Sequence, residues 1–479
     1  MKKIAYVASE CVPFIKTGGL ADVVGALPKI FDKEMYDVRV IIPNYMSIPS
    51  KYREKMKFIT NFYMDIGWKK QYVGILYMEY EGVPIYFIDN EYYFNGIGPY
   101  SEAKWDIEKF CFFSKAALSI LPVVGFQPDI VHCHDWQSGM VSVYLKTLFA
   151  GNPFFSGIKS IMTIHNLQYQ GRWDIDYVQA CSGLPSYLFT ADKLEIHKDA
   201  SMLKGGLVYS DKITTVSETY AKEIQTIYYG EGLDGLLQAR SQSLLGIVNG
   251  IDYDVYNPAK DSHIAKNYTA KTFKKNRKFN KLALQEELGL LVDEEQFMIG
   301  IISRLTNQKG LDLIDAVMNE ICQDGVQFVV LGTGDKNYEE MFRYYQEFHP
   351  TKVSANIYFS DALSHKMYAA CDTMLVPSRF EPCGLTQLMA LRYGALPIVR
   401  ETGGLKDTVE PYNEYEQMGT GFSFANYNEY ELLNTIQYAR TIFTEQRQDW
   451  ENMQFRAMNM DYSWDASAKK YEEIYESIQ

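Results

Sequence analysis

The chain has 479 residues, of which 47% are apolar and 22% are charged, and its formal net charge is −13. A chain of this length is expected to form two or three globular domains, each with a sizeable core. The acidic balance argues against a nucleic-acid binder, which would show a basic face, and against docking on an anionic membrane. The seven cysteines are scattered without a C-x-x-C pair, as in a reduced cytoplasmic protein.

Short apolar runs alternate with helical spacing through the first half of the chain. Strands are predicted at residues 4–7, 38–42, 85–87, 130–133, 159–164, 212–216 and 245–248, and helices at residues 19–30, 105–121, 137–149 and 217–228. Continuously apolar strands between helices are typical of a parallel sheet covered on both faces. The first apolar run is too short for a signal peptide, and no stretch is long enough to span a bilayer.

The pattern changes near Asn249-Gly250-Ile251-Asp252. Residues 260–281 are rich in Lys and are predicted to be a solvated loop and helix surface, and strands then follow at residues 297–302, 327–331, 356–359, 373–377 and 396–399. We therefore predict an α/β fold with two doubly wound Rossmann-like domains that face a central cleft, residues 1–248 and 249–455. Residues 456–479 contain a final helix with apolar residues at helical spacing, predicted to pack back on the first domain.

A glycine-rich hexapeptide occurs twice. Thr17-Gly18-Gly19-Leu20-Ala21-Asp22 has a near copy at residues 402–407, and each copy lies between a predicted strand and a stretch of helical spacing. Paired glycines let backbone N–H groups approach a ligand, and a helix N-terminus favours an anion such as phosphate. The alternative is two similar tight turns in unrelated Rossmann-like units.

Charged residues follow two strands of the second half. Arg304 and Lys309 come after the strand at 297–302, where fixed positive charge would suit a diphosphate and a departing anion. Glu381 follows the strand at 373–377 and precedes a helix predicted to begin near Cys383. A solvated pair of cations and a carboxylate that merely complements a helix dipole are the alternatives.

Polar residues also follow two strands of the first half. Asp135 and Trp136 could contact a carbohydrate through a carboxylate and an aromatic face, and His165 with Asn166 offers polar groups at the next strand end, although a lone histidine there could be structural. The run His132-Cys133-His134 does not favour a metal site, because its histidines are expected to point to opposite faces and no second ligand group follows at zinc spacing. Complete dinucleotide, P-loop and G-x-S-x-G motifs are missing from the sequence.

In this order the segments resemble those of bacterial glycogen synthases and plant starch synthases, which are glycosyltransferases of the GT-B fold. The resemblance covers nearly the whole chain, and each motif is weak alone but specific in series. The segments begin at Lys16, His134, His165, Tyr169, Lys204, Asn249, Ser303, Gln308, Glu381 and Thr402.

The resemblance implies a retaining glucosyltransferase that moves glucose from ADP-glucose to the non-reducing 4-hydroxyl of an α-1,4-glucan such as glycogen. It implies no metal and no other cofactor. A GT-B transferase that uses UDP-glucose or another acceptor, and a non-catalytic glucan-binding protein, stay open as alternatives. The oligomeric state is left open.

The resemblance also implies roles for individual residues. Catalytic roles fall to Glu381, Arg304, Lys309 and His165; donor binding falls to Lys16, Gly18, Gly19, Asp22, Phe359, Cys383, Gly384, Leu385 and Thr386; acceptor or sugar contacts fall to Asp135, Trp136, Asn166 and Asn249. Two positions depart from the family pattern. Phe359 stands where a nucleobase-stacking Tyr is frequent, and Gln137 stands where His is frequent.

Overall fold

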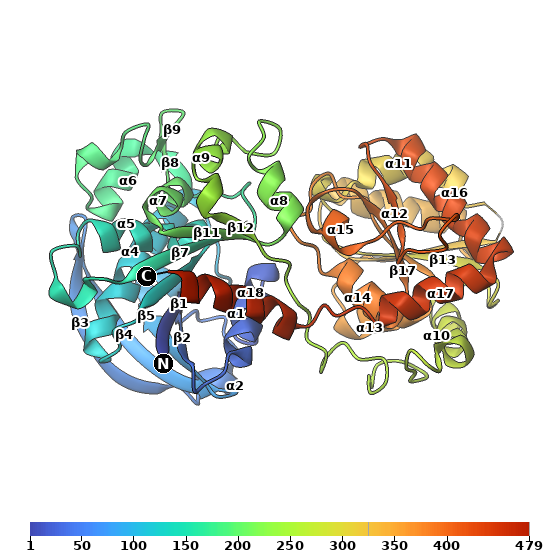
Figure 1. Ribbon diagram of the computed structural model, residues 1–479, viewed down its shortest axis with the longest axis horizontal. Helices are drawn as coiled ribbons and strands as arrows, with labels where there is room; N and C mark the ends of the chain where they lie inside the picture. The colour runs from blue at the N-terminus through green and yellow to red at the C-terminus, as the bar shows by residue number, and fades with distance from the viewer. Residues whose placement is uncertain (324, 479) are drawn as a thin grey trace. The chain divides into compact units, whose positions relative to one another are not determined.

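The structure is a computed structural model that describes residues 1–323 and 325–478. The chain forms two compact α/β units. Unit 1 contains residues 1–247 and the C-terminal helix that begins at Trp464, and unit 2 contains Val248–Ser463. Each unit has a largely parallel sheet with helices on both faces (Figure 1), so the predicted pair of doubly wound α/β domains is confirmed.

Unit 1 is built on a nine-stranded sheet with the order β12-β11-β7-β6-β1-β2-β5-β4-β3. Its strands are β1 (Lys2–Val7), β2 (Tyr36–Pro43), β3 (Lys57–Ile66), β4 (Lys69–Tyr80), β5 (Val83–Asp89), β6 (Ile130–His134), β7 (Lys159–Ile164), β11 (Lys212–Thr215) and β12 (Leu244–Gly246). A separate three-stranded sheet consists of β8 (Arg172–Asp174), β10 (Asp199–Ser201) and β9 (Glu195–Ile196).

The prediction of a parallel sheet in unit 1 was wrong at one edge. Strands β3 and β4 were not predicted, and they pair antiparallel with each other and with β5. The sequence of β3 does carry a strand signal, because Phe62, Met64 and Ile66 recur on one side at a period of two residues.

The helices of unit 1 cover both faces of its sheet (Figure 1). They are α1 (Gly19–Ile30), α2 (Ser50–Arg53), α3 (Glu91–Phe94), α4 (Ala103–Val123), α5 (Gly139–Lys146), α6 (Ile175–Ser182), α7 (Met202–Tyr209), α8 (Glu218–Glu223), α9 (Asp234–Ala239) and α18 (Trp464–Ser477). The helix predicted at 217–228 was too long, because α8 ends at Glu223 and the following Ile227 and Tyr228 are exposed.

The C-terminal helix α18 belongs to unit 1. It packs beside α1, and it buries Tyr471, Ile474 and Tyr475 in the core of unit 1 (Figure 1). The segment predicted to return, residues 456–479, was set too early. Its first residues lie in α17 (Arg447–Met458), whose Trp450 and Met453 are buried in the core of unit 2, and the returning segment begins at Trp464.

Unit 2 has a six-stranded parallel sheet with the order β15-β14-β13-β16-β17-β18. Its strands are β13 (Phe297–Ile302), β14 (Val326–Leu331), β15 (Val353–Asn356), β16 (Thr373–Val376), β17 (Leu396–Arg400) and β18 (Phe422–Phe424). Its helices are α10 (Phe273–Leu288), α11 (Leu311–Ile321), α12 (Lys336–Phe348), α13 (Asp361–Ala370), α14 (Thr386–Tyr393), α15 (Gly403–Thr408), α16 (Glu429–Glu445) and α17. The strand predicted at 356–359 was misplaced, because β15 ends at Asn356 and Phe359 is 90% exposed.

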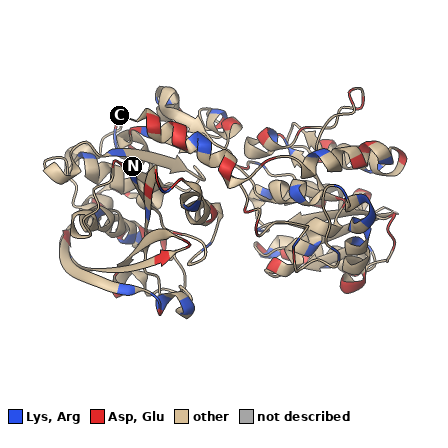
Figure 2. Cartoon of the chain, turned by 60° about the horizontal axis from the view of Figure 1, so that its bottom comes forward, with Lys and Arg blue, Asp and Glu red and all other residues tan. Residues whose placement is uncertain are grey.

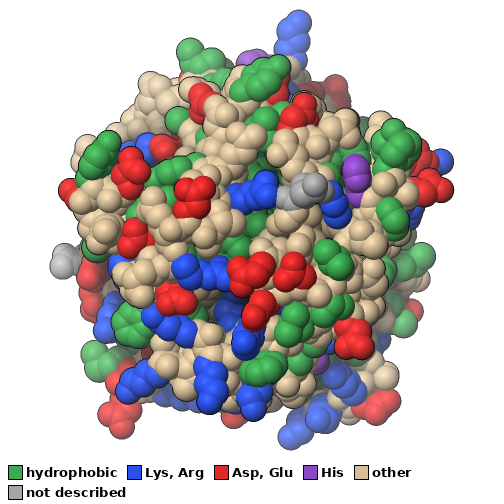
Figure 3. Space-filling view, turned by 90° about the vertical axis from the view of Figure 1, so that its right-hand side faces the viewer, with side chains coloured by type: hydrophobic (Ala, Val, Ile, Leu, Met, Phe, Trp, Pro, Cys, Tyr) green, Lys and Arg blue, Asp and Glu red, His purple; other side chains and the backbone are tan. Residues whose placement is uncertain are grey.

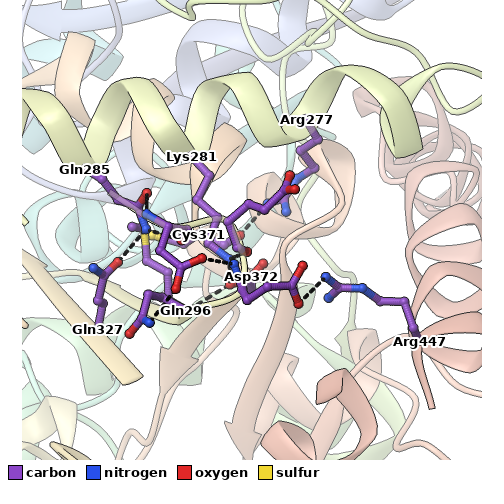
Figure 4. Close-up of polar contacts among 12 residues, drawn as sticks. Arg277, Lys281, Gln285, Gln296, Gln327, Cys371, Asp372 and Arg447 are labelled. Carbon is purple, nitrogen blue, oxygen red and sulfur yellow. Dashed lines mark hydrogen bonds and ion pairs between the residues drawn. The ribbon is translucent and has the colours of Figure 1, made fainter. Parts of the chain in front are cut away.

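A buried polar cluster ties α10 to the sheet of unit 2 (Figure 4). Lys281 Nζ lies 2.7 Å from Asp372 Oδ2, and the same carboxylate oxygen accepts the N–H of Met298 at 2.8 Å. The Arg277 guanidinium donates to the carbonyl oxygens of Tyr393 and Cys371. The prediction that the basic stretch 260–281 is a solvated surface was therefore wrong for these two residues, whose charges are satisfied inside the fold.

Acidic and basic residues are otherwise interspersed along the helices of each unit (Figure 2). The face of unit 2 that lies to the right in Figure 1 shows Lys, Arg, Asp and Glu side by side (Figure 3). Among residues 1–323 and 325–478, every helix is too short or too polar to cross a bilayer.

Replacement of Lys281 by Met should lower the free energy of unfolding by about 3–5 kcal/mol, because it leaves the buried Asp372 carboxylate without its cation. Urea unfolding followed by circular dichroism measures the loss. Lys278→Met on the same helix is the control: its ion pair with Glu294 is nearly half exposed, so a change within about 0.5 kcal/mol is expected. Equal losses in the two variants would contradict a special role for the buried pair.

Candidate active site

The first copy of the glycine-rich hexapeptide forms an exposed loop and the start of α1. Gly18 precedes the helix and Gly19 is its first residue. A Cβ atom added to either glycine would meet nothing within 4 Å. The fold itself therefore does not require glycine at these two positions, and the space beside the loop is open to a ligand.

Charged side chains hold this loop in place. Lys16 Nζ lies 2.7 Å from Asp22 Oδ1, and Lys16 is half exposed. Burial raises the pKa of Asp22, and the Lys16 ammonium opposes that rise. From beneath, the buried Glu10 carboxylate accepts the N–H of Thr17, its hydroxyl at 2.7 Å and the Tyr100 hydroxyl.

Glu10 and Tyr100 were missed as candidate site residues. Glu10 lies three residues after the end of the predicted strand at 4–7, and the rule that functional residues gather at strand ends could have found it. Tyr100 lies in a loop far along the chain, without a local signal. Its hydroxyl also accepts a hydrogen bond from Gln137 Nε2 at 3.1 Å, which places the departure at Gln137 in this same cluster.

Asp135 lies at the end of β6 in a strained backbone conformation, with φ of 56° and ψ of −175°. Such a conformation is uncommon for a residue other than glycine, and it is found mostly where function requires it. The carboxylate is buried, and its Oδ1 accepts the N–H of His165 at 2.7 Å and of Asn166 at 3.4 Å. Burial raises the pKa of Asp135 to about 7, while the two N–H donors oppose the rise.

His165 donates its N–H to this carboxylate, and Trp136 follows Asp135 in the chain. His165 is 9% exposed, and its Nε2 lies 3.0 Å from Nδ1 of His134. Burial lowers the pKa of His165 to about 3, so its imidazole is neutral at pH 7. The Trp136 ring is half-buried and packs edge-on against Phe110, with ring centroids 5.2 Å apart.

The prediction that His132 and His134 point to opposite faces of the strand was wrong. The two rings stack, with centroids 4.4 Å apart and an interplanar angle of 24°. Residues two apart in a strand share a face, which explains the arrangement. Among the residues that the structure describes, no group of three or more His, Cys, Asp or Glu side chains has the geometry of a metal site.

In unit 2, the ends of β13 and β16 and the start of α14 line a cavity of about 130 Å³. Arg304, Lys309, Glu381, Leu385 and Thr386 are among its lining residues, so the structure brings together most of the predicted donor-binding groups of this half. Helix α14 begins at Thr386, and its first N–H groups and positive dipole end lie at the cavity.

The charges of this cavity are arranged in pairs. Lys309 Nζ donates to Glu381 Oε2 at 2.7 Å, and the Ser378 hydroxyl donates to the same oxygen at 2.8 Å. Glu381 is 7% exposed, so these two donors compensate for its loss of water. Arg304 is exposed, and its guanidinium has no ion-pair partner in the part of the chain that the structure describes.

The glycines in the second copy of the hexapeptide are required for close packing, unlike those in the first copy. Gly403 has φ of +47°, and an added Cβ would lie 1.9 Å from the Glu381 carbonyl oxygen. A Cβ on Gly404 would lie 2.1 Å from the Cys383 carbonyl oxygen, and the Gly404 N–H donates to Glu381 O at 3.1 Å. These glycines therefore let α15 pack directly against the segment that presents Glu381.

The other predicted residues are placed as follows. The Cys383 thiol is buried, its pKa is raised to about 12 by burial, and it accepts a hydrogen bond from the Asn249 N–H. Asn249 is itself buried, and its Oδ1 has no hydrogen-bond partner among the described residues. Gly384 lines the cavity, and Phe359 stands in the exposed loop before α13.

Comparison with known proteins identifies the family. The model of the starch synthase catalytic domain matches residues 3–239, and that of group 1 glycosyl transferases matches residues 287–453. The glycogen synthase of Lachnospira eligens is 61% identical over 478 residues, which covers 100% of both chains. The chain belongs to the glycogen and starch synthase family. The glycogen synthase of Clostridium perfringens is 50% identical over 99% of this chain and 98% of its own.

Solved structures agree with this membership. The catalytic domain of starch synthase IV from Arabidopsis thaliana superposes with a TM-score of 0.91 at 32% identity, with 99% of each chain covered. Sucrose-phosphate synthase from Thermosynechococcus elongatus, at 16% identity and a TM-score of 0.64, shares the fold. As a member of the glycogen and starch synthase family, the chain is an enzyme and a glycosyltransferase with the GT-B fold.

The two glycine copies should respond differently to alanine. Gly403→Ala is expected to lower the free energy of unfolding by about 2 kcal/mol or more, because its Cβ would collide with the Glu381 carbonyl at a positive φ. Gly18→Ala should change stability by no more than about 0.5 kcal/mol, because its Cβ enters open space. Thermal unfolding compares the variants, and similar losses in both would refute the distinction.

Asp135→Asn should stabilise the protein at pH 8. The pKa of Asp135 is raised from 3.8 to about 7, so its ionised form costs stability above pH 7, and this cost disappears as the pH falls toward 4. The gain from Asn should reach up to about 4 kcal/mol above pH 7 and shrink steadily below it. Melting temperatures of both proteins at pH 8 and pH 5 test this, and a difference independent of pH would contradict it.

Proposed function

We propose that the enzyme transfers glucose from ADP-glucose to the 4-hydroxyl at the non-reducing end of an α-1,4-glucan, with retention of the anomeric configuration. The glycogen synthases among its relatives support a glucan product. The Arabidopsis starch synthase structure holds ADP and acarbose, which supports an adenine nucleotide as the donor's leaving group.

The observation that carries the proposal is the cavity of unit 2. It combines two cations, Arg304 and Lys309, with the N-terminal amides of α14 beside a buried carboxylate. Fixed positive charge and oriented N–H groups stabilise negative charge as it develops on a departing diphosphate. Among the residues that the structure describes, Arg304 has no competing ion pair, and Lys309 is held in place by Glu381.

The same cavity supports a front-face mechanism. Retaining glycosidases use two carboxyl groups about 5–5.5 Å apart, one of them as a nucleophile. Among the described residues that line the cavity, Glu381 is the sole carboxylate, and its Oε2 is already bound to Lys309 and Ser378. We therefore assign Glu381 to holding Lys309 and the donor glucose. The bond to the diphosphate loosens first, and the acceptor hydroxyl attacks from the same side and gives its proton to the leaving phosphate oxygen.

In unit 1, Lys16, Gly18 and Gly19 would contact the donor, and Asp135, Trp136, His165 and Asn166 would contact the transferred glucose or the acceptor. Exposed Phe359 would stack on the adenine, since stacking needs an aromatic face and not a hydroxyl. The cations of the cavity would neutralise the diphosphate without a metal ion. Catalysis without a metal ion and a cytoplasmic location both stay predictions.

Release of nucleoside diphosphate with and without glycogen tests the proposal, with ADP-glucose and UDP-glucose compared at equal concentration. Glycogen-dependent release of ADP, well above that of UDP, is the expected result. An α-configuration of the new linkage, observed by proton NMR, would establish retention. Preferred release of UDP would overturn the donor assignment, and no release from either donor would overturn the proposed reaction.

Arg304→Ala and Lys309→Ala should each lower kcat by about 10²–10³-fold or more, as the loss of a preorganised charge-stabilising group does in other enzymes. Arg304 is the cleaner probe, because its exposed side chain supports no other residue of the described fold. Lys336→Ala is the matched control, since that lysine is 85% exposed on α12 of the same unit. Wild-type turnover in the Arg304 variant would remove it from the mechanism.

A further inference from the structure

Three buried histidines lie next to one another in unit 1. His132 and His134 stand on one face of β6, and His165 follows β7, which is paired with β6. Burial lowers the pKa of His132 and of His165 to about 3 and that of His134 well below its ordinary value. All three rings are therefore neutral, and each has one N–H donor and one acceptor nitrogen.

The hydrogen bond from His134 to His165 determines which nitrogens carry protons. His134 Nδ1 and His165 Nε2 are 3.0 Å apart, so one of them donates and the other accepts. The second nitrogen of His134, Nε2, is sealed from solvent and has no partner among the described residues. A buried N–H without an acceptor is rarer than an unused lone pair, so the proton of His134 belongs on Nδ1.

This assignment sets the state of His165. Its Nε2 accepts from His134, so its own proton lies on Nδ1, a nitrogen without a partner among the described residues. The main chain of His165 is held at the same time, because its N–H donates to Asp135 at 2.7 Å. Two neighbouring residues of the β6 end thus hold His165 at two points.

We propose that His134 is a positioning residue for the reaction: its Nδ1–H fixes the ring and tautomer of His165 so that the Nδ1–H of His165 is presented to the reacting sugar. The inference rests on the proposed function, in which His165 lies beside that sugar. His165 then acts as a neutral hydrogen-bond donor and not as a general base, because its basic nitrogen is occupied.

The C-terminal helix supports this arrangement from below. The Tyr475 hydroxyl of α18 lies 2.8 Å from His132 Nδ1 and 2.5 Å from the Tyr6 hydroxyl. His132 Nε2 lies 2.6 Å from the Thr163 hydroxyl, so both ring nitrogens of His132 are engaged. The fixed His132 ring stacks on His134, which limits the orientations open to His134. Docking of α18 therefore contributes to the position of His165.

Two substitutions of His134 separate hydrogen bonding from packing. Asn places an N–H donor near the position of Nδ1 but has no ring, whereas Phe keeps a ring in contact with Tyr6 and His132 but has no donor. We expect His134→Phe to lower kcat at least tenfold with KM changed less than twofold, and His134→Asn to keep kcat within about threefold of wild type. The reverse order would overturn the proposal in favour of a packing role.

Nitrogen-15 spectra of protein labelled at histidine test the assignment without an activity measurement. In the wild-type enzyme the His165 signals, identified by their loss in His165→Ala, should show protonated Nδ1 and hydrogen-bonded, unprotonated Nε2. Protonated Nε2 at His165 would overturn the proposal even if both variants were inactive. Lack of glucosyl transfer by the wild type with the expected spectrum would instead contradict the proposed function alone.

A pair of tyrosine variants tests the contribution of α18. Tyr475→Phe removes the hydroxyl that holds His132 and is expected to lower kcat about three- to tenfold, with KM unchanged. Tyr36→Phe is the matched control, because its hydroxyl binds Glu476 of the same helix at 2.9 Å without contact to the histidines. Equal kcat values in the two variants would contradict the link between α18 and His165.

Discussion

The grouping of polar residues in each unit depends on parallel strand pairing. A parallel strand must be followed by a crossover that carries the chain back to the end of the sheet where the first strand began. The carboxyl ends of successive strands therefore lie together, along what we call the carboxyl edge of the sheet. In unit 1 the register pairs His134 with Thr163, which brings the ends of β6 and β7 together and with them Asp135 and His165. In unit 2 the same rule joins the ends of β13 and β16, where Arg304 and Glu381 follow.

Burial of charge at these edges requires a specific partner for every carboxylate. Removing a carboxylate from water costs several kcal/mol unless donors replace the water, and the donors then fix its orientation. Asp135 is held by backbone N–H groups, and Glu381 is held by Lys309 and Ser378. Glu10 is held by Thr17 and Tyr100 in the same manner. The hydrogen bonds that compensate these carboxylates for their loss of water therefore also fix their orientation.

Nearly identical sequence motifs can meet different physical demands. The loop at Gly18 and Gly19 leaves open space where a side chain would stand, which suits the approach of a ligand. The loop at Gly403 and Gly404 has that space filled by the carbonyls of Glu381 and Cys383, and it serves the packing of the segment that carries Glu381. The repeated motif alone did not distinguish these two roles. The sequence shows that a glycine is present, but it does not show which atoms pack beside that glycine in the fold.

Local pattern determined much of this protein. The order of apolar runs and helical spacing was enough for the α/β class, most strands and the grouping of Arg304 with Glu381, because strand ends share an edge whatever their neighbours are. The ordered motifs were enough for the family. Residues 356–359 were predicted as a strand from their apolar content, but β15 ends at Asn356. Strand β3 was missed although apolar residues alternate along it. Apolar content and alternation are separate signals, and they disagreed in these two segments.

Tertiary structure alone decided which charges are buried and what they touch. Lys281 was indistinguishable in sequence from its solvated neighbours until α10 packed against Asp372. His132 meets Tyr475 across 343 residues of sequence, so neither residue carries a local sign of the other. Hydrogen bonds and desolvation depend on positions in space, and a one-dimensional pattern records those positions only where the chain neighbours are also the spatial ones.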